Sequence, residues 1–262
     1  MSLSNKPETD SAKNNSHWFE EWFDSPLYEK LYSYRDEDEA KKLADLIEKL
    51  VPQANYKKIL DLGCGRGRHS LTLAERGYDV SGTDLSPKAI KKAKQLATER
   101  GLNNVHFEIR DMREVLSHKF DAILNLFTTF GYFLDDEENA SVFDSVHKML
   151  DKNGLFLIDF LNAAKVEEGL VPAESGSYEN LDYHIERFIA DGMVHKKIRF
   201  TGTGLKEPVE YQERVKLYGK EWFEQQLKAR GFNIIEFIGD FSGSSFSEAI
   251  SPRLIILAEK KV

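Results

Sequence analysis

The chain has 262 residues, of which 41% are hydrophobic and 31% charged, and these values are typical of a globular enzyme built around one large core. Its formal net charge of −8, without a dense stripe of lysine and arginine, makes nucleic acid and anionic membranes unexpected partners. The polar start and the lack of a long apolar run predict a cytoplasmic protein without a membrane segment.

The N-terminal region divides into a tail and an aromatic segment. Residues 1–16 are polar and are expected to form a disordered tail. Residues 17–34 gather aromatic side chains in an amphipathic stretch, which predicts a helical cap over residues 17–50. Tyr28 and Tyr32, spaced i and i+4, would share one helix face. The aromatic stretch is expected either to lie over a ligand as a lid or to pack on the edge of a sheet.

A glycine-rich turn follows the first predicted strand. The stretch "ILDLGCGRG" ends an apolar run on Asp61 and then alternates three glycines with other residues, Gly63, Gly65 and Gly67. Glycine permits backbone angles and close approaches that side chains forbid, so the turn is expected to lie against a ligand. The helical pattern that starts at Arg68 would point free N–H groups to the same place. The G-x-G-x-G spacing differs from the G-x-G-x-x-G of dinucleotide enzymes.

The single cysteine lies inside this turn. One cysteine excludes an internal disulfide framework, and a small side chain is what the position of Cys64 requires. A reactive thiol is the alternative for Cys64, and it is disfavoured because no base is evident nearby in the sequence.

Strands and helices alternate after the turn. A second strand ends at Asp84, and further strands are predicted over residues 105–112, 120–127 and 154–162, with a helix over residues 136–150. Such alternation predicts an α/β fold with a parallel sheet and helices on both faces.

The remainder of the chain departs from this alternation. Residues 178–218 alternate apolar and polar side chains around the turn Asp191-Gly192, which predicts a three-stranded antiparallel insertion. Residues 233–241 and 253–261 read as strands without a helix between them, so they are expected to pair antiparallel.

Together these features resemble the class I S-adenosylmethionine-dependent methyltransferases. The turn reads D-x-G-x-G-x-G over residues 61–67, and the resemblance is strong over residues 40–160. It implies S-adenosylmethionine as cofactor and a Rossmann-like, seven-stranded, mostly parallel sheet with an antiparallel final strand. The catalytic core would span residues 51–161 and 217–262, and the β insertion would span residues 162–216.

The resemblance also implies a set of cofactor-binding residues. In the family, an acid after the second strand holds the ribose hydroxyls and an acid after the third addresses the adenine, which points to Asp84 and Asp111. The alternatives that stay open are a helix cap for Asp84, a solvated turn for Asp111 and a solvent-facing position for Arg68. The residues expected to bind the cofactor are Asp61, Gly63, Cys64, Gly65, Arg68, Asp84, Leu85, Asp111, Met112, Asn125, Leu126, Phe127, Tyr28 and Tyr32.

The acceptor is expected to be a small molecule that is methylated on nitrogen or oxygen. Phe127 and Tyr132 are the implied substrate-binding residues, and no metal is implied. The insertion would roof the acceptor pocket or, alternatively, contact a second copy of the chain in a homodimer. His184 and His195 are candidates for a general base, although positioning alone can supply most of the acceleration.

Two other functions stay open at this point. One is a non-catalytic protein that binds the cofactor as a sensor or degenerate enzyme. The other is a nicotinamide-dependent oxidoreductase, which the glycine spacing and the antiparallel ending disfavour.

Overall fold

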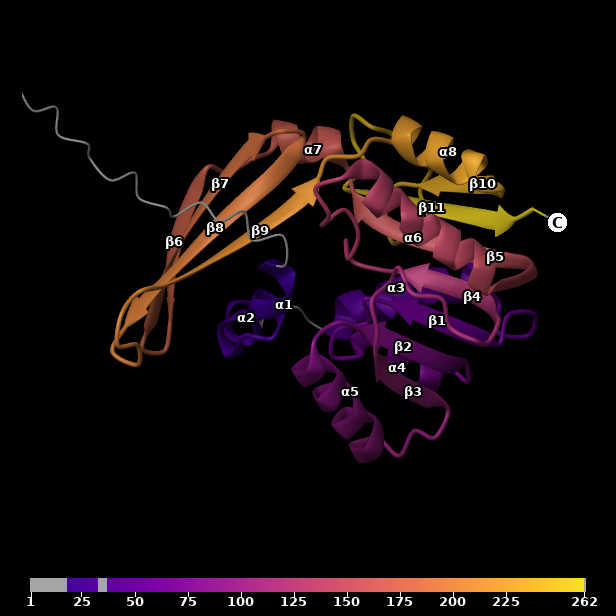
Figure 1. The fold of residues 1–262 in the computed structure, drawn as a ribbon, viewed down its shortest axis with the longest axis horizontal. Helices are drawn as coiled ribbons and strands as arrows, with labels where there is room; N and C mark the ends of the chain where they lie inside the picture. Colours follow the sequence, from indigo (N-terminus) through magenta and orange to yellow (C-terminus); the bar gives the residue numbers. More distant parts are fainter. Residues whose placement is uncertain (1–17, 33–36, 262) are drawn as a thin grey trace, which may run out of the picture.

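The computed structural model describes residues 18–32 and 37–261. The tail expected over residues 1–16 lies outside the described residues. Two sheets organise the rest of the chain, a seven-stranded sheet in the core and a four-stranded sheet beside it (Figure 1).

The central sheet has the strand order β10-β11-β5-β4-β1-β2-β3. In chain order the strands are β1 (Lys58–Leu62), β2 (Asp79–Asp84), β3 (Val105–Ile109), β4 (Phe120–Asn125), β5 (Leu150–Leu161), β10 (Phe232–Ile238) and β11 (Arg253–Lys260). Neighbouring strands pair parallel except at β11, which is antiparallel to both β5 and β10. The predicted Rossmann-like sheet with a reversed final strand is confirmed. The order reverses between β1 and β4, and open α/β sheets bind ligands beyond the carboxyl ends at such a point.

Helices cover both faces of this sheet. The helices α3 (Glu37–Leu50), α4 (Arg68–Glu75) and α5 (Pro87–Glu99) bury their apolar side chains in one core, and α6 (Asp136–Met149) and α8 (Lys220–Ala229) do so in a second core. Successive strand residues alternate between the two cores, as Ile59 and Leu60 of β1 do. Because each central strand is buried on both faces, it reads as an apolar run in the sequence.

The second sheet, which we call the β arm, contains β6 (Ala173–Tyr178), β7 (Leu181–Ala190), β8 (Met193–Gly202) and β9 (Val209–Lys216). The short helix α7 (Ala163–Glu168) leads into it from β5. The expected hairpin turn is confirmed, with Asp191 and Gly192 at φ 52° and 68° between β7 and β8. The arm has four strands, whereas the sequence indicated three. The strand β6 was missed because its polar edge-strand residues lack the alternating pattern.

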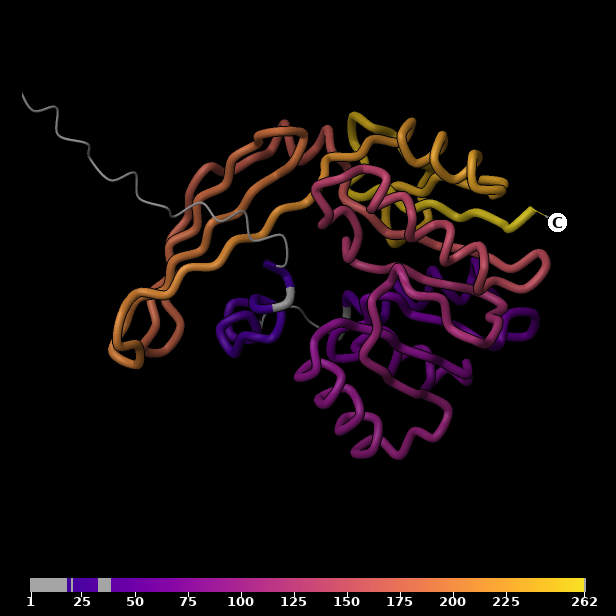
Figure 2. The backbone as a smooth tube through the Cα atoms, viewed as in Figure 1, coloured from indigo at the N-terminus to yellow at the C-terminus, as the bar shows by residue number. Residues whose placement is uncertain are grey.

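Two short helices lie between the β arm and the core (Figure 2). These are α1 (Trp18–Phe23) and α2 (Pro26–Leu31), which together we call the aromatic cap. The sequence grouped residues 17–50 as one cap, but α3 instead buries Leu43 and Ile47 with α4 in the core. Its apolar spacing is that of a helix packed on a sheet. Across residues 18–32 and 37–261, no helix is long and apolar enough to cross a bilayer.

Candidate functional site

A cavity of about 500 Å³ opens where the core, the aromatic cap and the β arm meet. This volume lies within the range of about 300 to 1,000 Å³ that is usual for small-molecule sites. The core contributes Asp61, Gly63, Cys64, Gly65, Arg66, Arg68, His69, Asp84, Leu85, Ser86, Ala89, Arg110, Met112, Leu126, Phe127, Thr128, Thr129, Tyr132, Phe133 and Arg253. The aromatic cap and the following residue contribute Trp18, Phe19, Phe23, Tyr28, Glu29 and Tyr32, and the β arm contributes Glu213 and Val215.

The glycine turn forms the floor of this cavity. Gly63, Gly65 and Gly67 have φ of 73°, 56° and 80°, which is left-handed backbone that favours glycine. A Cβ added at Gly63 would lie 2.8 Å from Thr129, so that glycine is required by packing. A Cβ added at Gly65 would meet no atom within 4 Å among the described residues. The backbone of Gly65 is therefore open to a ligand.

Asp84 ties the end of β2 to the glycine turn. One carboxylate oxygen accepts a hydrogen bond from the Gly65 N–H at 2.9 Å, and the other accepts one from the Ser86 N–H at 2.9 Å. Burial raises the pKa of the Asp84 carboxyl. The hydroxyl of Ser86 caps α5 by accepting from the Ala89 N–H, so capping is not the main role of Asp84. Each oxygen of Asp84 retains acceptor capacity for a ligand hydroxyl.

Two further titratable groups line the cavity beside the turn. Asp61 is buried and accepts a hydrogen bond from the Ser70 hydroxyl at 2.5 Å, and burial raises the pKa of Asp61 to about 6. Burial, followed by the charge of Arg68, lowers the pKa of His69 to about 3. The imidazole of His69 is therefore neutral at pH 7. Burial raises the pKa of the Cys64 thiol, which argues against a reactive thiol.

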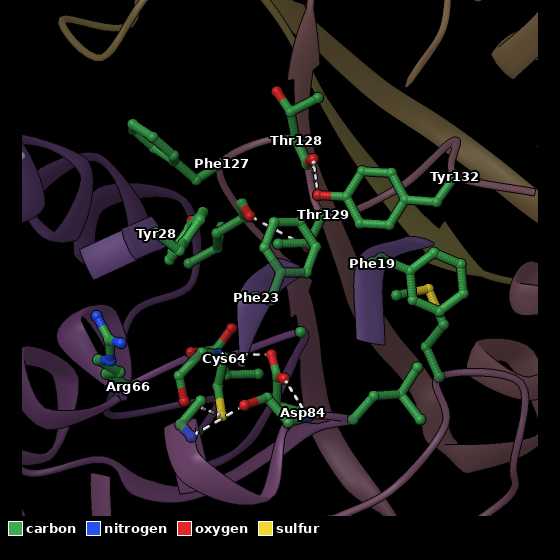
Figure 3. A pocket seen from close by; sticks show the side chains of 18 of the residues that line it. Phe19, Phe23, Tyr28, Cys64, Arg66, Asp84, Phe127, Thr128, Thr129 and Tyr132 are labelled. Atoms are coloured by element: carbon green, nitrogen blue, oxygen red, sulfur yellow. Dashed lines mark hydrogen bonds between the residues drawn. The ribbon is translucent and has the colours of Figure 1, made fainter. Parts of the chain in front are cut away.

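Aromatic rings of the cap face the turn across the cavity. Figure 3 shows the rings of Phe23 and Tyr28 between Cys64 and Asp84 below and Phe127 above. The ring of Trp18 lies 5.3 Å from that of Tyr132, in the loop that follows β4. The cavity is therefore enclosed by apolar faces on the side that does not carry the glycines.

Most of the residues expected from the sequence meet in this cavity. They are Tyr28, Tyr32, Asp61, Gly63, Cys64, Gly65, Arg68, Asp84, Leu85, Met112, Leu126, Phe127 and Tyr132. Asp111 does not line it, because the guanidinium of Arg113 binds its carboxylate at 2.5 and 2.9 Å. Asn125 is fully buried and donates to the Leu62 carbonyl at 3.1 Å, so it also lies outside the lining.

The two histidines that were candidates for a general base lie away from the cavity. His184 is on β7 with its Nδ1 2.8 Å from the Ser175 hydroxyl. His195 stacks on Phe188 with ring centroids 4.8 Å apart. His195 pairs in register with Arg214, which is next to the cavity residue Glu213 in β9. Because adjacent residues of a strand point to opposite faces, His195 and Arg214 lie on the face of the β arm away from Glu213. The expectation of a base at either histidine is therefore not supported by the geometry.

Glu213 and Glu29 are the cavity carboxylates that the sequence did not indicate, and Glu213 has the denser contacts. Its Oε1 accepts hydrogen bonds from the Trp22 indole N–H at 2.5 Å and the Tyr32 hydroxyl at 2.7 Å. Its Oε2 lies 3.8 Å from the Lys196 ammonium. These contacts join the β arm to the aromatic cap, and they are not visible in the sequence because Glu213 and Trp22 are 191 residues apart. Within the described ranges, no group of three or more His, Cys, Asp or Glu side chains is arranged to hold a metal ion.

Comparison with known proteins places the chain among methyltransferases. A family model described as a methyltransferase domain matches residues 54–208. A glycine/sarcosine N-methyltransferase of Aphanothece halophytica is 25% identical over 198 residues, covering 74% of this chain and 72% of the relative. A second, from Halorhodospira halochloris, is 24% identical over 256 residues and covers 95% and 92%. The dTDP-3-amino-3,4,6-trideoxy-alpha-D-glucopyranose N,N-dimethyltransferase of Streptomyces venezuelae is 28% identical over 136 residues, or 51% and 55%.

Solved structures share the fold over 90% of this chain. An S-adenosylmethionine-dependent methyltransferase from Clostridium acetobutylicum ATCC 824 superposes with a TM-score of 0.78 at 22% identity, covering 90% of this chain and 97% of that one. An amino pentose methyltransferase from Micromonospora echinaspora, solved with S-adenosylmethionine bound, has a TM-score of 0.67 at 21% identity and covers 90% and 98%.

The family match also bears on the two alternative functions. It favours methyl transfer over hydride transfer to nicotinamide, and an enzyme over a protein that only binds a cofactor. The chain belongs to the methyltransferase domain family, and its fold is that of the class I S-adenosylmethionine-dependent methyltransferases.

Proposed function

We propose that the protein transfers a methyl group from S-adenosylmethionine to a nitrogen atom of a small molecule. The observation that carries this proposal is the composition of one cavity, in which the open backbone of Gly65 and the carboxylate of Glu213 belong to different walls. The open backbone of Gly65 allows a cofactor to lie directly against the turn, and the carboxylate of Glu213 can bind a cationic acceptor.

The described residues fit S-adenosylmethionine. Gly65 leaves space where any side chain would intrude, and Asp84 offers carboxylate oxygens to the ribose hydroxyls. Arg68, at the start of α4, suits the cofactor carboxylate because a guanidinium and a helix N-terminus both favour an anion. Leu85 and Met112 provide apolar walls for the adenine. Bound there, S-adenosylmethionine supplies a methyl group on a sulfonium, which is already an activated leaving group.

The aromatic cap suits the charge on both partners of the reaction. A sulfonium and an ammonium are each attracted to the faces of aromatic rings, by about 0.5 to 2 kcal/mol depending on solvation. Trp18, Phe23 and Tyr28 present such rings to the cavity. By covering the cavity they also exclude water, which strengthens every electrostatic contact inside it.

A nitrogen acceptor fits the acid–base groups of the cavity better than a hydroxyl. An amine carries positive charge before and after methylation, and the Glu213 carboxylate can hold the ammonium in both states. A hydroxyl would require a base near pH 7. The pKa of His69 is lowered to about 3, and both oxygens of Asp84 are tied to backbone N–H groups. Asp61 has a pKa of about 6, but its carboxyl is buried and bound by the Ser70 hydroxyl. The relatives named as N-methyltransferases support the same choice.

The residues of the chain then act mainly by positioning. The acceptor ammonium first gives one proton to solvent or to Glu213, which frees the nitrogen lone pair. The lone pair then forms the new N–C bond while the electron pair of the broken C–S bond stays on sulfur, and the product is again an ammonium. Holding the two reactants in line can lower the barrier by about 7 to 11 kcal/mol. This account requires no strong base from the protein.

The test is S-adenosylhomocysteine formation with matched pairs of small amines and alcohols, such as propylamine and propanol, and with fractions of a metabolite extract. Turnover that is confined to amines supports the proposal. Turnover of alcohols at equal or higher kcat/KM contradicts it.

A further inference from the structure

An arginine from the far end of the chain reaches the cavity. Arg253, at the start of β11, is part of the cavity wall, and 22% of its side chain is exposed. Its Nε donates to Oδ1 of Asp159 at 2.8 Å, and one terminal nitrogen donates to the hydroxyl of Thr128 at 2.8 Å. Asp159 itself is fully buried in β5. The hydrogen bonds to Asp159 and Thr128 therefore hold the guanidinium in a single orientation.

Asp159 also fixes the backbone at the end of β4. Phe127 and Thr128 have φ of 62° and 61°, a conformation that costs non-glycine residues about 1 to 3 kcal/mol and that clusters at functional sites. The Phe127 N–H donates to Oδ2 of Asp159 at 2.9 Å, and the Thr128 N–H donates to its carbonyl at 3.0 Å. Asp159 thus fixes both the backbone of Phe127 and Thr128 and the guanidinium of Arg253.

The second terminal nitrogen of Arg253 has no hydrogen-bond or ion-pair partner among residues 18–32 and 37–261. A guanidinium carries five N–H donors, and its planar edge matches the two oxygens of a carboxylate or phosphate. Arg253 and Arg68 both lie over the ring of Phe127, at 5.8 and 4.8 Å from its centroid. Two cations therefore flank one ring in the cavity wall of an otherwise acidic protein.

We propose that Arg253 binds an anionic oxygen group of the methyl acceptor. The inference rests on the proposed function, because it assigns Arg68 to the cofactor and leaves Arg253 for the second substrate. The acceptor is then a small amine that also carries a carboxylate or a phosphate, with its ammonium on Glu213 and its anion on Arg253.

Matched substrate pairs test this assignment. Glycine against glycinamide examines the carboxylate, and 2-aminoethyl phosphate against 2-aminoethanol examines the phosphate, with S-adenosylhomocysteine release as the readout. We expect the anionic member of at least one pair to have a KM about 10- to 100-fold lower, the value of a charge-assisted hydrogen bond. A KM that is equal within each pair overturns the inference while leaving N-methylation intact.

The arginine variants locate the effect. Arg253→Met should raise the KM of the preferred anionic amine about 10- to 100-fold, leave that of its neutral partner unchanged and leave S-adenosylhomocysteine affinity within threefold by calorimetry. Arg253→Gln keeps an N–H donor for Asp159 but removes the charge, so it serves as the test if Arg253→Met does not fold, and an unchanged KM in it overturns the inference. Arg187→Met is the matched control, because Arg187 is also 22% exposed and ion-paired but lies on β7 outside the cavity lining.

A binding measurement separates failure of this inference from failure of the proposed function. Trp18 lines the cavity, so its fluorescence reports occupancy of the protein loaded with S-adenosylhomocysteine. If no amine turns over, the proposed function fails. Anionic amines that bind wild-type protein and Arg253→Met equally, or that do not bind, then overturn the role of Arg253, whereas binding lost only in the variant upholds it.

Discussion

Folding opposes the ionisation of the Asp61 carboxyl, because this group is buried. Burial raises its pKa from the ordinary 3.8 to about 6, although the Ser70 hydroxyl partly compensates. Between these values the folded chain holds a proton that the unfolded chain has lost. The contribution of Asp61 to stability is therefore complete below about pH 4 and is lost as the pH rises through about 6.

Asp61→Asn should remove this dependence while keeping an acceptor for Ser70. We expect the free energy of unfolding of the variant, relative to wild type, to increase by about 2 to 3 kcal/mol between about pH 4 and pH 7.5. Urea denaturation at both pH values measures it. His69 acts in the opposite direction, because its lowered pKa gives stability that is lost as the pH falls from 6.5 toward 3. Because the two effects oppose each other, the variant must be compared with wild type at each pH. A difference in the free energy of unfolding that stays constant with pH would contradict the assignment to Asp61.

Asp84 is the residue on which cofactor binding should depend most. Asp84→Ala removes the acceptors for two ribose hydroxyls and should weaken S-adenosylmethionine binding about 10- to 100-fold in titration calorimetry. Asp79→Ala is the control, since Asp79 is an exposed residue at the start of the same strand. Equal affinities for the two variants would show that Asp84 only holds the turn.

Among the individual residues, the sequence predicted the glycine turn and Asp84 because both are set by local geometry at a strand end. The role of Asp111 at the adenine stays a prediction, because Asp111 lies outside the cavity lining and Arg113 binds its carboxylate. The sequence missed Glu213 and Arg253 because each reaches the cavity through strand pairing that no local pattern encodes.

The aromatic cap is held by the β arm more than by its own helices. Each helix has only six residues, which is too short to be stable alone. Trp22 is fully buried, with its ring 4.4 Å from Tyr211 of β9 and its indole N–H on Glu213. On the other side, the Asp24 carboxylate accepts from the Ser86 hydroxyl at 2.7 Å and so links the cap to the core.

Trp22→Ala should release the cap without unfolding the core. Loss of a buried tryptophan costs about 3 to 5 kcal/mol, so amide hydrogen exchange in residues 18–32 should accelerate at least tenfold while β1 and β4 stay protected. Phe188→Ala, which removes an exposed ring on β7, should change neither region. Equal acceleration in the cap and the core of Trp22→Ala would show that the cap is an integral part of the core.

For the whole molecule, the alternation of strands and helices predicted the central sheet because each central strand is buried on both faces. The sequence placed the β arm over the acceptor pocket only by resemblance. Which of its residues reach the cap was not predictable, since the hydrogen bonds between them join residues 149 to 191 positions apart. The cavity is a product of that long-range docking.

Binding of the cofactor should stabilise the whole fold. A ligand at 100-fold excess over its Kd adds about 2.7 kcal/mol to the free energy of unfolding, and in a chain of this size that raises Tm by about 5 to 11 °C. We expect S-adenosylmethionine and S-adenosylhomocysteine to produce this shift in calorimetry, and NADH to produce none. A shift with NADH alone would contradict the cofactor assignment.

The most direct measurement is the destination of the methyl group. The protein is incubated with S-adenosylmethionine carrying a ¹³C-methyl and with a fractionated metabolite extract, and the labelled products are observed by ¹³C NMR. We expect the label to move to the nitrogen of a small anionic amine, in equal amount to the S-adenosylhomocysteine released. A label that appears on oxygen or carbon, or on macromolecules instead of a small molecule, would contradict it.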